Sequence, residues 1–193
     1  MDAAAFSRLR LGVTLSIALT YTSLLVWQHW HGGVPGHSFL ARDDLPVISN
    51  WWGALVLPAL TFFLTGRLRA RLAKAELDSS VGAHRGTAAL GVAGAAFGGA
   101  LLYGAILATS FATGHSDVSS LLFQSLLVIG LLLPIYRAEY VLGFVLGLTY
   151  TFGAVLPTFI AAVIATISGA LHLTVRRGFD WLMARRAVTT RRE

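Results

Sequence analysis

Half of the histidines in this chain stand in one short segment, HWHGGVPGHSFLARDD, which begins at His29. Imidazole and carboxylate groups are common protein ligands of zinc and of non-haem iron or manganese. A catalytic zinc site needs three such ligands and an open position for water, whose pKa the metal lowers to about 7. A second segment adds one histidine and one aspartate. The candidate ligands of a divalent metal ion, with zinc the preferred one, are therefore His29, His31, His37, His115 and Asp117.

The first segment also holds side chains that suit hydrolysis at a bound metal. Metal-bound water or a general base would attack the substrate, and a neighbouring cation or hydroxyl would orient it. The candidate catalytic residues are His37, Ser38, Arg42, Asp43 and Asp44. The spacing matches no fixed metal motif such as HExxH, so the hypothesis rests on residue types gathered on two loops.

Each of these residues also has a structural interpretation. His29 and His31 flank a tryptophan and fit an aromatic belt at the lipid headgroups. Asp117 stands where it can cap a helix, and the aspartates of the long loop can pair with Arg42. Both interpretations stay open at the level of sequence.

The rest of the chain is too apolar for a soluble domain. Of its 193 residues, 55% are hydrophobic and only 12% are charged, whereas soluble domains average about 25% charged residues. Long apolar runs at such a charge content indicate an integral membrane protein. Cysteine is absent from the sequence, which excludes disulfides, thiolate metal sites and cysteine nucleophiles.

The apolar runs predict an all-α, multi-pass membrane protein in which residues 1–175 form one transmembrane domain of six helices. The uncharged stretch 140–175 must contain two helices, because a single one would be about 54 Å long against a hydrocarbon core of about 30 Å. Gly153 can end the first of them, and Pro157 suits the first turn of the second. The expected spans are 11–28, 51–66, 87–111, 118–135, 140–154 and 157–175.

The basic residues predict the topology. With six spans and a cytoplasmic amino terminus, 14 of the 15 basic residues lie on the cytoplasmic side, and Arg42 alone lies outside. Five spans would leave 8 inside and 7 outside, which discards the positive-inside bias. The sequence therefore predicts a cell inner-membrane protein with both termini in the cytoplasm. The net charge of +6 is then a topology signal, and a nucleic-acid partner is not expected.

Two further features predict partners. The basic tail 176–193 has the pattern of a short amphipathic helix lying in the cytoplasmic interface, where it would contact anionic lipid headgroups. Gly94 and Gly98 in the third span, and Gly143 and Gly147 in the fifth, form small-residue faces. Such faces let helices approach closely, either within one chain or in a homo- or hetero-oligomer.

Polar side chains gather in the outer halves of the spans, where they would line a cavity open to the outside. Alternatively, the hydroxyl groups bond back to carbonyls of their own helix. The candidate substrate-cavity residues are Tyr21, Asn50, Trp51, Gln124 and Tyr150.

Three functions compete on this evidence. The histidine and aspartate set favours a metal-dependent membrane enzyme, a hydrolase that acts on an amphiphilic or lipid-like substrate. The outer polar cavity also fits a solute-binding or transport protein for a small, weakly charged ligand. The glycine faces fit an accessory subunit of a larger membrane complex.

Overall fold

Six α-helices and a small two-stranded sheet form the part of the chain that the structure describes. The structure is a computed structural model, and it describes residues 3–34, 36–38, 47–77 and 82–189. The elements in chain order are α1 (Ala3–Trp30), β1 (Gly36–Ser38), β2 (Val47–Ser49), the 3₁₀ turn η2 (Asn50–Trp52), α2 (Gly53–Leu77), α3 (Gly82–Ala112), α4 (Ser116–Leu132), α5 (Ala138–Phe152) and α6 (Val155–Thr189).

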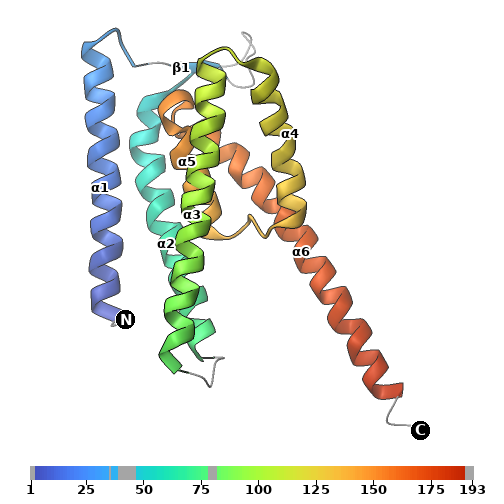
Figure 1. The fold of residues 1–193 in the computed structure, drawn as a ribbon. Coiled ribbons are helices and arrows are strands. Elements are labelled where there is room, and N and C mark those ends of the chain that lie inside the picture. Colours follow the sequence, from blue (N-terminus) through green and yellow to red (C-terminus); the bar gives the residue numbers. More distant parts are fainter. Residues whose placement is uncertain (1–2, 35, 39–46, 78–81, 190–193) are drawn as a thin grey trace.

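Successive helices run in alternate directions, so the start of α1 and the end of α6 lie at the same end of the molecule (Figure 1). The opposite end carries the antiparallel sheet, in which His37 pairs with Ile48, together with the α3–α4 loop and the α5–α6 turn (Figure 1). We call it the hairpin end, and we call the other one the terminal end. The end of α1 and the α3–α4 loop, which carry four predicted metal ligands, therefore share the hairpin end.

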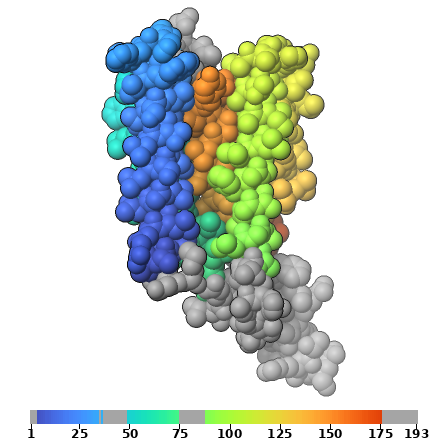
Figure 2. Space-filling model, turned by 60° about the vertical axis from the view of Figure 1, so that its left-hand side comes forward, coloured from blue at the N-terminus to red at the C-terminus, as the bar shows by residue number. Residues whose placement is uncertain are grey.

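The shortest helix, α5, forms the centre of the bundle. It packs closely against α3, with α2 and α6 on its other sides, and eight of its fifteen residues are buried. Figure 2 shows only a strip of the orange segment that holds α5, recessed between α1 and α3. Val145 at its middle is fully buried, and the main core cluster gathers around this helix. Because α5 is central, its side chains can contribute to cavities on several sides of the bundle.

Glycines bring α3 and α5 into backbone contact. A Cβ atom on Gly104 of α3 would lie 2.7 Å from the carbonyl oxygen of Phe144 in α5. Reciprocally, a Cβ atom on Gly147 of α5 would lie 2.8 Å from the backbone nitrogen of Ala105. Real side-chain atoms do not fit at such distances, so the close approach depends on glycine.

The small-residue face of α3 divides into two parts. Gly91, Gly94 and Gly98 meet no other atom within 4 Å of an added Cβ. The tight contact that α3 makes with α5 runs from Phe97 to Ala105, and Gly104 is the α3 glycine that faces α5 within it. The small face of α5 therefore packs inside the chain, whereas Gly94 and Gly98 of α3 remain open.

The turn between α5 and α6 confirms the division of residues 140–175 into two helices. Gly153 follows α5 with a φ of 68°, a left-handed conformation that glycine adopts without steric cost. Pro157 lies in the first turn of α6 and is buried. At the start of the second predicted span, the Ser49 hydroxyl accepts a hydrogen bond from the Trp51 nitrogen at 3.4 Å and caps η2.

The helices at the terminal end are longer than the predicted spans. Helix α2 continues to Leu77 and α1 begins at Ala3, because the basic segments beside the apolar runs are rich in arginine, lysine, leucine and alanine, which favour helix. The separate tail helix expected from residue 176 is wrong for the same reason. Residues 176–189 continue α6 without a break, and α6 leaves the bundle obliquely toward its end (Figure 1).

Length and composition identify four of the described helices, α1, α2, α3 and α6, as long and apolar enough to cross a membrane. Helices α4 and α5 are apolar but shorter, with 17 and 15 residues. At 1.5 Å per residue they measure about 26 and 22 Å, somewhat less than the hydrocarbon core of about 30 Å. The all-helical expectation is confirmed, and the chain has the character of a helical membrane protein.

Candidate functional site

The histidines at the end of α1 have aromatic and backbone partners. The His31 ring stacks on Trp27, with ring centroids 4.7 Å apart, and its Nδ1 lies 2.8 Å from the Trp27 carbonyl oxygen. His29 meets the edge of Trp51 at a centroid distance of 6.2 Å. Both rings are exposed among tryptophans, which is the arrangement of an aromatic belt at a membrane interface.

The second histidine segment lies in the α3–α4 loop. His115 Nδ1 lies 2.8 Å from the hydroxyl oxygen of Thr113, and the His115 carbonyl accepts the first hydrogen bond of α4, from the Ser119 nitrogen. Asp117 occupies the first turn of α4, where a negative charge interacts favourably with the helix dipole. Each residue therefore has a local role at the start of this helix.

The predicted zinc site is wrong. Within the ranges that the structure describes, no three His, Cys, Asp or Glu side chains come together in a way that could hold a metal ion. The reason is the distance between the elements: α1 stands at the edge of the bundle beside α2, whereas the His115 loop joins α3 to α4. His29, His31, His115 and Asp117 share one end of the molecule but not one site.

The predicted catalytic residues lie mostly outside the described part of the chain. His37 and Ser38 belong to β1 through their backbone, while their side chains are outside that part. Arg42, Asp43 and Asp44 are outside it entirely. These five residues remain a sequence-based hypothesis.

Two of the predicted cavity residues meet in a buried contact. The Tyr21 hydroxyl of α1 donates to the carbonyl oxygen of Asn50 at 3.3 Å, and both residues are buried. An added Cβ on Gly53 would overlap the Tyr21 ring, and one on Gly153 would overlap the Asn50 amide. The contact therefore joins α1, η2 and the α5–α6 turn, and this tight packing leaves no space there for a ligand.

The other predicted cavity residues lie apart from that contact. Trp51 is 43% exposed and Tyr150 is 68% exposed. Gln124 of α4 lines a cavity that Tyr21, Asn50, Trp51 and Tyr150 do not border. The structure thus places the five residues in separate environments.

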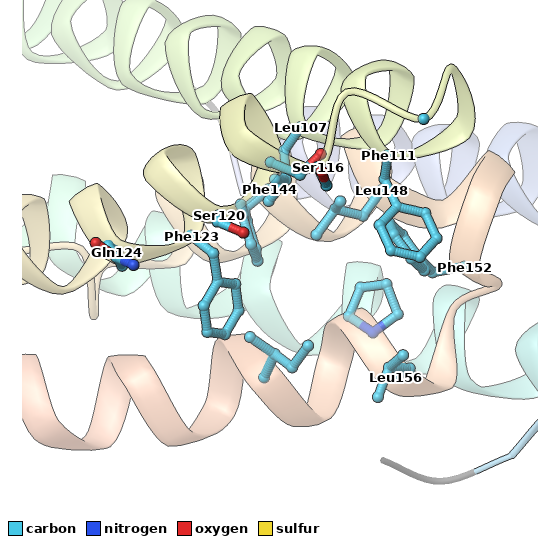
Figure 3. Close-up of a pocket in the computed structure, with 14 residues that line it drawn as sticks. Leu107, Phe111, Ser116, Ser120, Phe123, Gln124, Phe144, Leu148, Phe152 and Leu156 are labelled. Carbon is cyan, nitrogen blue, oxygen red and sulfur yellow. The ribbon is translucent and has the colours of Figure 1, made fainter. Parts of the chain in front are cut away.

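The cavity beside Gln124, the upper cavity, has a volume of about 620 Å³ and lies toward the hairpin end. Helices α3, α4, α5 and α6 line this half-open cavity, and Figure 3 shows aromatic and aliphatic side chains converging on it from these helices. Phe111 and Phe152 close one side, with ring centroids 4.8 Å apart. Its apolar wall includes Leu107, Phe123, Phe144, Leu148, Leu156 and Ile160.

Polar groups of the upper cavity come from α4 and the loop before it. Ser116, Ser120 and Gln124 recur at every fourth residue and so share one face of α4. Figure 3 shows Ser116, Ser120 and Gln124 following one another along α4, with Gln124 set apart from the converging apolar side chains. Ser119 differs, because it donates a hydrogen bond to the His115 carbonyl of its own helix at 3.0 Å. No described residue engages the side chain of Ser120 or Gln124, so both remain available to a ligand.

A lower cavity of about 500 Å³ lies between the same four helices, nearer the terminal end. Small residues of α3, namely Ala95, Ala96, Gly99 and Ala100, form one of its walls. Leu126, Ile129 and Leu133 of α4 and its C-terminal cap face it from the other side. Its side-chain polar atoms come from two tyrosines, Tyr103 and Tyr140. The lower cavity, like the upper one, is therefore predominantly apolar.

A partly buried ion pair joins α2 to α5 near the terminal end. Arg71 donates to Glu139 at 2.6 Å, and the Glu139 side chain is only 3% exposed. The second carboxylate oxygen of Glu139 has no hydrogen-bond partner among the described residues. Since Glu139 lies in the first turn of α5, the helix dipole also favours its negative charge. The pair borders neither cavity, and we assign it a structural role.

Sequence reasoning missed the serines of the upper cavity. Ser119 and Ser120 follow Asp117 so closely that their sequence position suggests a role in capping the helix, like that of Asp117, rather than in a cavity. The available signal was the four-residue spacing of Ser116, Ser120 and Gln124, which places polar groups on one stripe of an otherwise apolar helix. Even with that signal, only the fold shows that these residues border a cavity that α6 also lines.

No family model, curated protein or solved structure that was compared with this chain matches it. The geometry of the two cavities and the charge distribution of the sequence therefore remain as the guides to its function.

Proposed function

We propose that this protein is a membrane-embedded binding protein for an uncharged amphiphile. The observation that carries the proposal is the shape and chemistry of the upper cavity, an apolar space of about 620 Å³ with one polar stripe on α4. This volume falls within the range of about 300–1,000 Å³ that is usual for ligand pockets. The apolar walls accept a hydrocarbon chain, and Ser116, Ser120 and Gln124 hydrogen-bond its head.

The polar stripe decides which amphiphile binds. A hydrocarbon chain gains little by moving from lipid into an apolar protein cavity, because lipid tails are as apolar as leucine. Hydrogen bonds to a head group are scarcer inside a bilayer and so discriminate between ligands. Since the polar groups of Ser120 and Gln124 are a hydroxyl and an amide, the ligand's head carries hydroxyl groups or amides of its own.

Charge also favours a neutral head. None of the described residues that line the upper cavity is charged, so an anionic head would lack a cation to pair with. The acidic Asp117 in the first turn of α4 would further disfavour an anion. A monoacylglycerol, with hydroxyl groups on an uncharged head and one acyl chain, represents this ligand class.

We further propose that all six helices cross the cell inner membrane with both termini in the cytoplasm. The alternating helix directions and the shared end of α1 and α6 support this topology (Figure 1), as does the positive-inside bias of the sequence. The hairpin end then faces away from the cytoplasm, and the upper cavity opens in the outer half of the bilayer. The basic residues from Arg176 onward would lie near anionic headgroups of the inner leaflet.

The test uses native mass spectrometry of the purified, detergent-solubilised protein. A long-chain monoacylglycerol is offered together with the fatty acid of the same chain length, and we expect the neutral lipid to be retained preferentially. Leu156→Trp, which fills the cavity from α6, should lower the affinity for the monoacylglycerol about tenfold. The matched control is Leu121→Trp, because Leu121 is 67% exposed on α4 and does not line the cavity.

Two results would overturn the proposal. One is the absence of saturable monoacylglycerol binding to the unmodified protein. The other is equal loss of binding in both tryptophan variants, which would assign the effect to general disturbance of α4 and α6 rather than to the cavity.

The open glycines of α3 support a second proposal, in which the protein associates through this face with another membrane helix. Gly94 and Gly98 lie one turn apart and meet no other atom, and small residues at this spacing commonly mark helix–helix contacts in lipid. Because the chain has no cysteine of its own, Gly94→Cys provides a clean test. Disulfide-linked dimers formed in the membrane by this variant, but not by Leu121→Cys, would establish contact between two copies.

A further inference from the structure

The two cavities lie end to end beneath α4. The upper cavity is lined by α4 residues as far as Gln124, and the lower cavity by α4 residues from Leu126 onward. On α6 the division falls between Ile160 and Ala161. Of the residues that line either space, Phe144 alone lines both. This ring of α5 therefore stands at the boundary between them.

The surroundings of Phe144 hold its ring in place. Phe144 is only 6% exposed, and its ring lies 6.5 Å from that of Tyr103, centroid to centroid. Tyr103 is itself tied across to α4, since its hydroxyl contacts Ser125 Oγ at 2.8 Å and donates to the Leu122 carbonyl. The two aromatic rings and the buried Leu126 belong to one packed cluster, which lies where the two cavities adjoin.

The backbone beneath Phe144 is equally restricted. Gly104 of α3 approaches the Phe144 carbonyl so closely that an added Cβ would lie 2.7 Å from it. The neighbouring Gly143 faces α3 backbone in the same way, with an added Cβ 3.0 Å from the Leu101 nitrogen. These contacts fix the position of α5 against α3. Because the backbone cannot move, the size of the side chain at position 144 determines how far the two cavities are separated.

The walls of the lower cavity suit hydrocarbon better than a polar head. The alanine and glycine residues of α3 leave its space open, and apart from two tyrosine hydroxyl groups its remaining walls are aliphatic and aromatic. The Tyr103 hydroxyl is already engaged by α4. A head group that entered this space would meet only the Tyr140 hydroxyl and would lose its other hydrogen bonds, at a cost that hydrocarbon does not incur.

We propose that Phe144 sets the maximum chain length of the amphiphile bound in the upper cavity, and that the lower cavity is a latent extension of the same site for longer chains. This inference rests on the proposed function, because it assumes that the acyl chain enters from the polar stripe of α4. The chain then runs along α4 toward the terminal end and stops at the Phe144 ring.

The experiment offers the purified protein a mixture of monoacylglycerols that differ in chain length and reads the bound species by native mass spectrometry. For the unmodified protein we expect an upper limit of chain length, beyond which the affinity falls about tenfold for each added methylene group that cannot be accommodated. Phe144→Ala joins the two cavities, so we expect this limit to move to longer chains.

A second substitution closes the extension again. Gly99 lines the lower cavity, and an added Cβ there meets no atom within 4 Å. Gly99→Phe should therefore fill the lower cavity without disturbing the helices. Combined with Phe144→Ala, it should restore the original length limit, and alone it should leave the chain-length profile unchanged.

Two control variants distinguish the specific effect of removing the Phe144 ring from a general loosening of the helix bundle. Leu142→Ala also removes a buried side chain of α5, but Leu142 lines neither cavity and belongs to a different cluster. We expect it to leave the chain-length limit in place. Phe144→Leu retains more of the buried volume, so it provides a folded variant with a smaller shift in the same direction if Phe144→Ala is too unstable to purify.

The outcomes distinguish this inference from the proposed function. Saturable binding with the same length limit in wild type, Phe144→Ala and Phe144→Leu would overturn the role of Phe144 and leave the upper site intact. A shift that Gly99→Phe does not reverse would overturn the role of the lower cavity. If the unmodified protein binds no monoacylglycerol, the proposed function fails and this inference fails with it.

Discussion

Helix α3 makes two very different contacts. Against α5 it packs backbone to backbone, because Gly104, Gly143 and Gly147 remove the side chains that would separate the helices. Against α4 it is held by the Tyr103 hydroxyl, and the small side chains of α3 leave an open space there. The same kind of residue thus closes one interface and opens the other.

These two contacts of α3 show that small residues in a membrane helix do not by themselves specify close packing. In lipid there is no hydrophobic force that drives two helices together, so contact requires complementary surfaces and polar ties. Helix α5 presents glycines that match those of α3. Helix α4 instead presents leucine and isoleucine side chains and a carbonyl group that accepts a hydrogen bond from the tyrosine of α3. The space between α4 and α3 is therefore available to a ligand.

The largest effect is expected from filling the closed interface. Gly147→Leu places a side chain against the backbone of α3, where an added Cβ already lies 2.8 Å from the Ala105 nitrogen. We expect destabilisation by more than about 3 kcal/mol, seen as loss of folded protein in thermal unfolding followed by circular dichroism. Gly98→Leu is the control, because Gly98 faces open space. Similar losses in both variants would refute the distinction between the two faces.

A smaller effect is expected from the ion pair that fastens α5 to α2. Arg71→Met leaves the nearly buried Glu139 carboxylate without its partner. Arg71 is itself 37% exposed, so solvent screens part of the interaction, and we expect a loss of about 1–3 kcal/mol. The double variant Arg71→Met with Glu139→Gln should recover much of this loss, because no uncompensated charge remains. A double variant as unstable as Arg71→Met alone would contradict the explanation.

Loosening the open interface should cost less stability. Tyr103→Phe removes the hydroxyl that joins α3 to the Leu122 carbonyl and to Ser125 of α4. Hydrogen bonds between membrane helices are worth about 0.6 kcal/mol on average and rarely more than 2. We therefore expect a drop of about 1 kcal/mol in the free energy of unfolding, together with faster release of bound monoacylglycerol. Unchanged release would contradict a role of these hydrogen bonds in retaining the ligand.

The smallest effect is expected from replacing one of two neighbouring serines that differ in their hydrogen bonds. Ser120→Ala removes a hydroxyl that faces the upper cavity, and we expect the monoacylglycerol affinity to fall about threefold to tenfold, the value of one hydrogen bond. Ser119→Ala removes a hydroxyl that is already bonded to the His115 carbonyl. It should leave the affinity unchanged in the same mass-spectrometric titration. The reverse result would move the polar contact to the other side of α4.

Much of the fold follows from local sequence signals. The turn at Gly153 and Pro157 was predictable because one residue permits a left-handed conformation and the other favours the start of a helix. The Ser49 cap was predictable for a similar local reason. The ends of α2 and α6 were not, because an apolar run marks the part suited to lipid, whereas the helix continues into any neighbouring segment of high helix propensity.

The candidate site was far less predictable. Histidine and aspartate attracted attention because they are chemically versatile, yet His29 and His31 contact tryptophans and His115 contacts Thr113. Whether such side chains converge depends on which helices are neighbours, and that information is absent from their spacing. Gln124 was selected as a cavity residue for its polarity, but its neighbours in the cavity were not.

Local sequence signals are enough to predict a helical chain of membrane-protein character and the turn that divides its last apolar stretch. These properties follow from hydrophobicity, charge and backbone conformation, which act over a few residues at a time. The central position of α5, the separation of α4 from α3 and the place of Phe144 beside two cavities appear only in the folded molecule. The physical reason is that cavities arise from the shapes of surfaces far apart in sequence, and no local preference encodes how well two such surfaces fit.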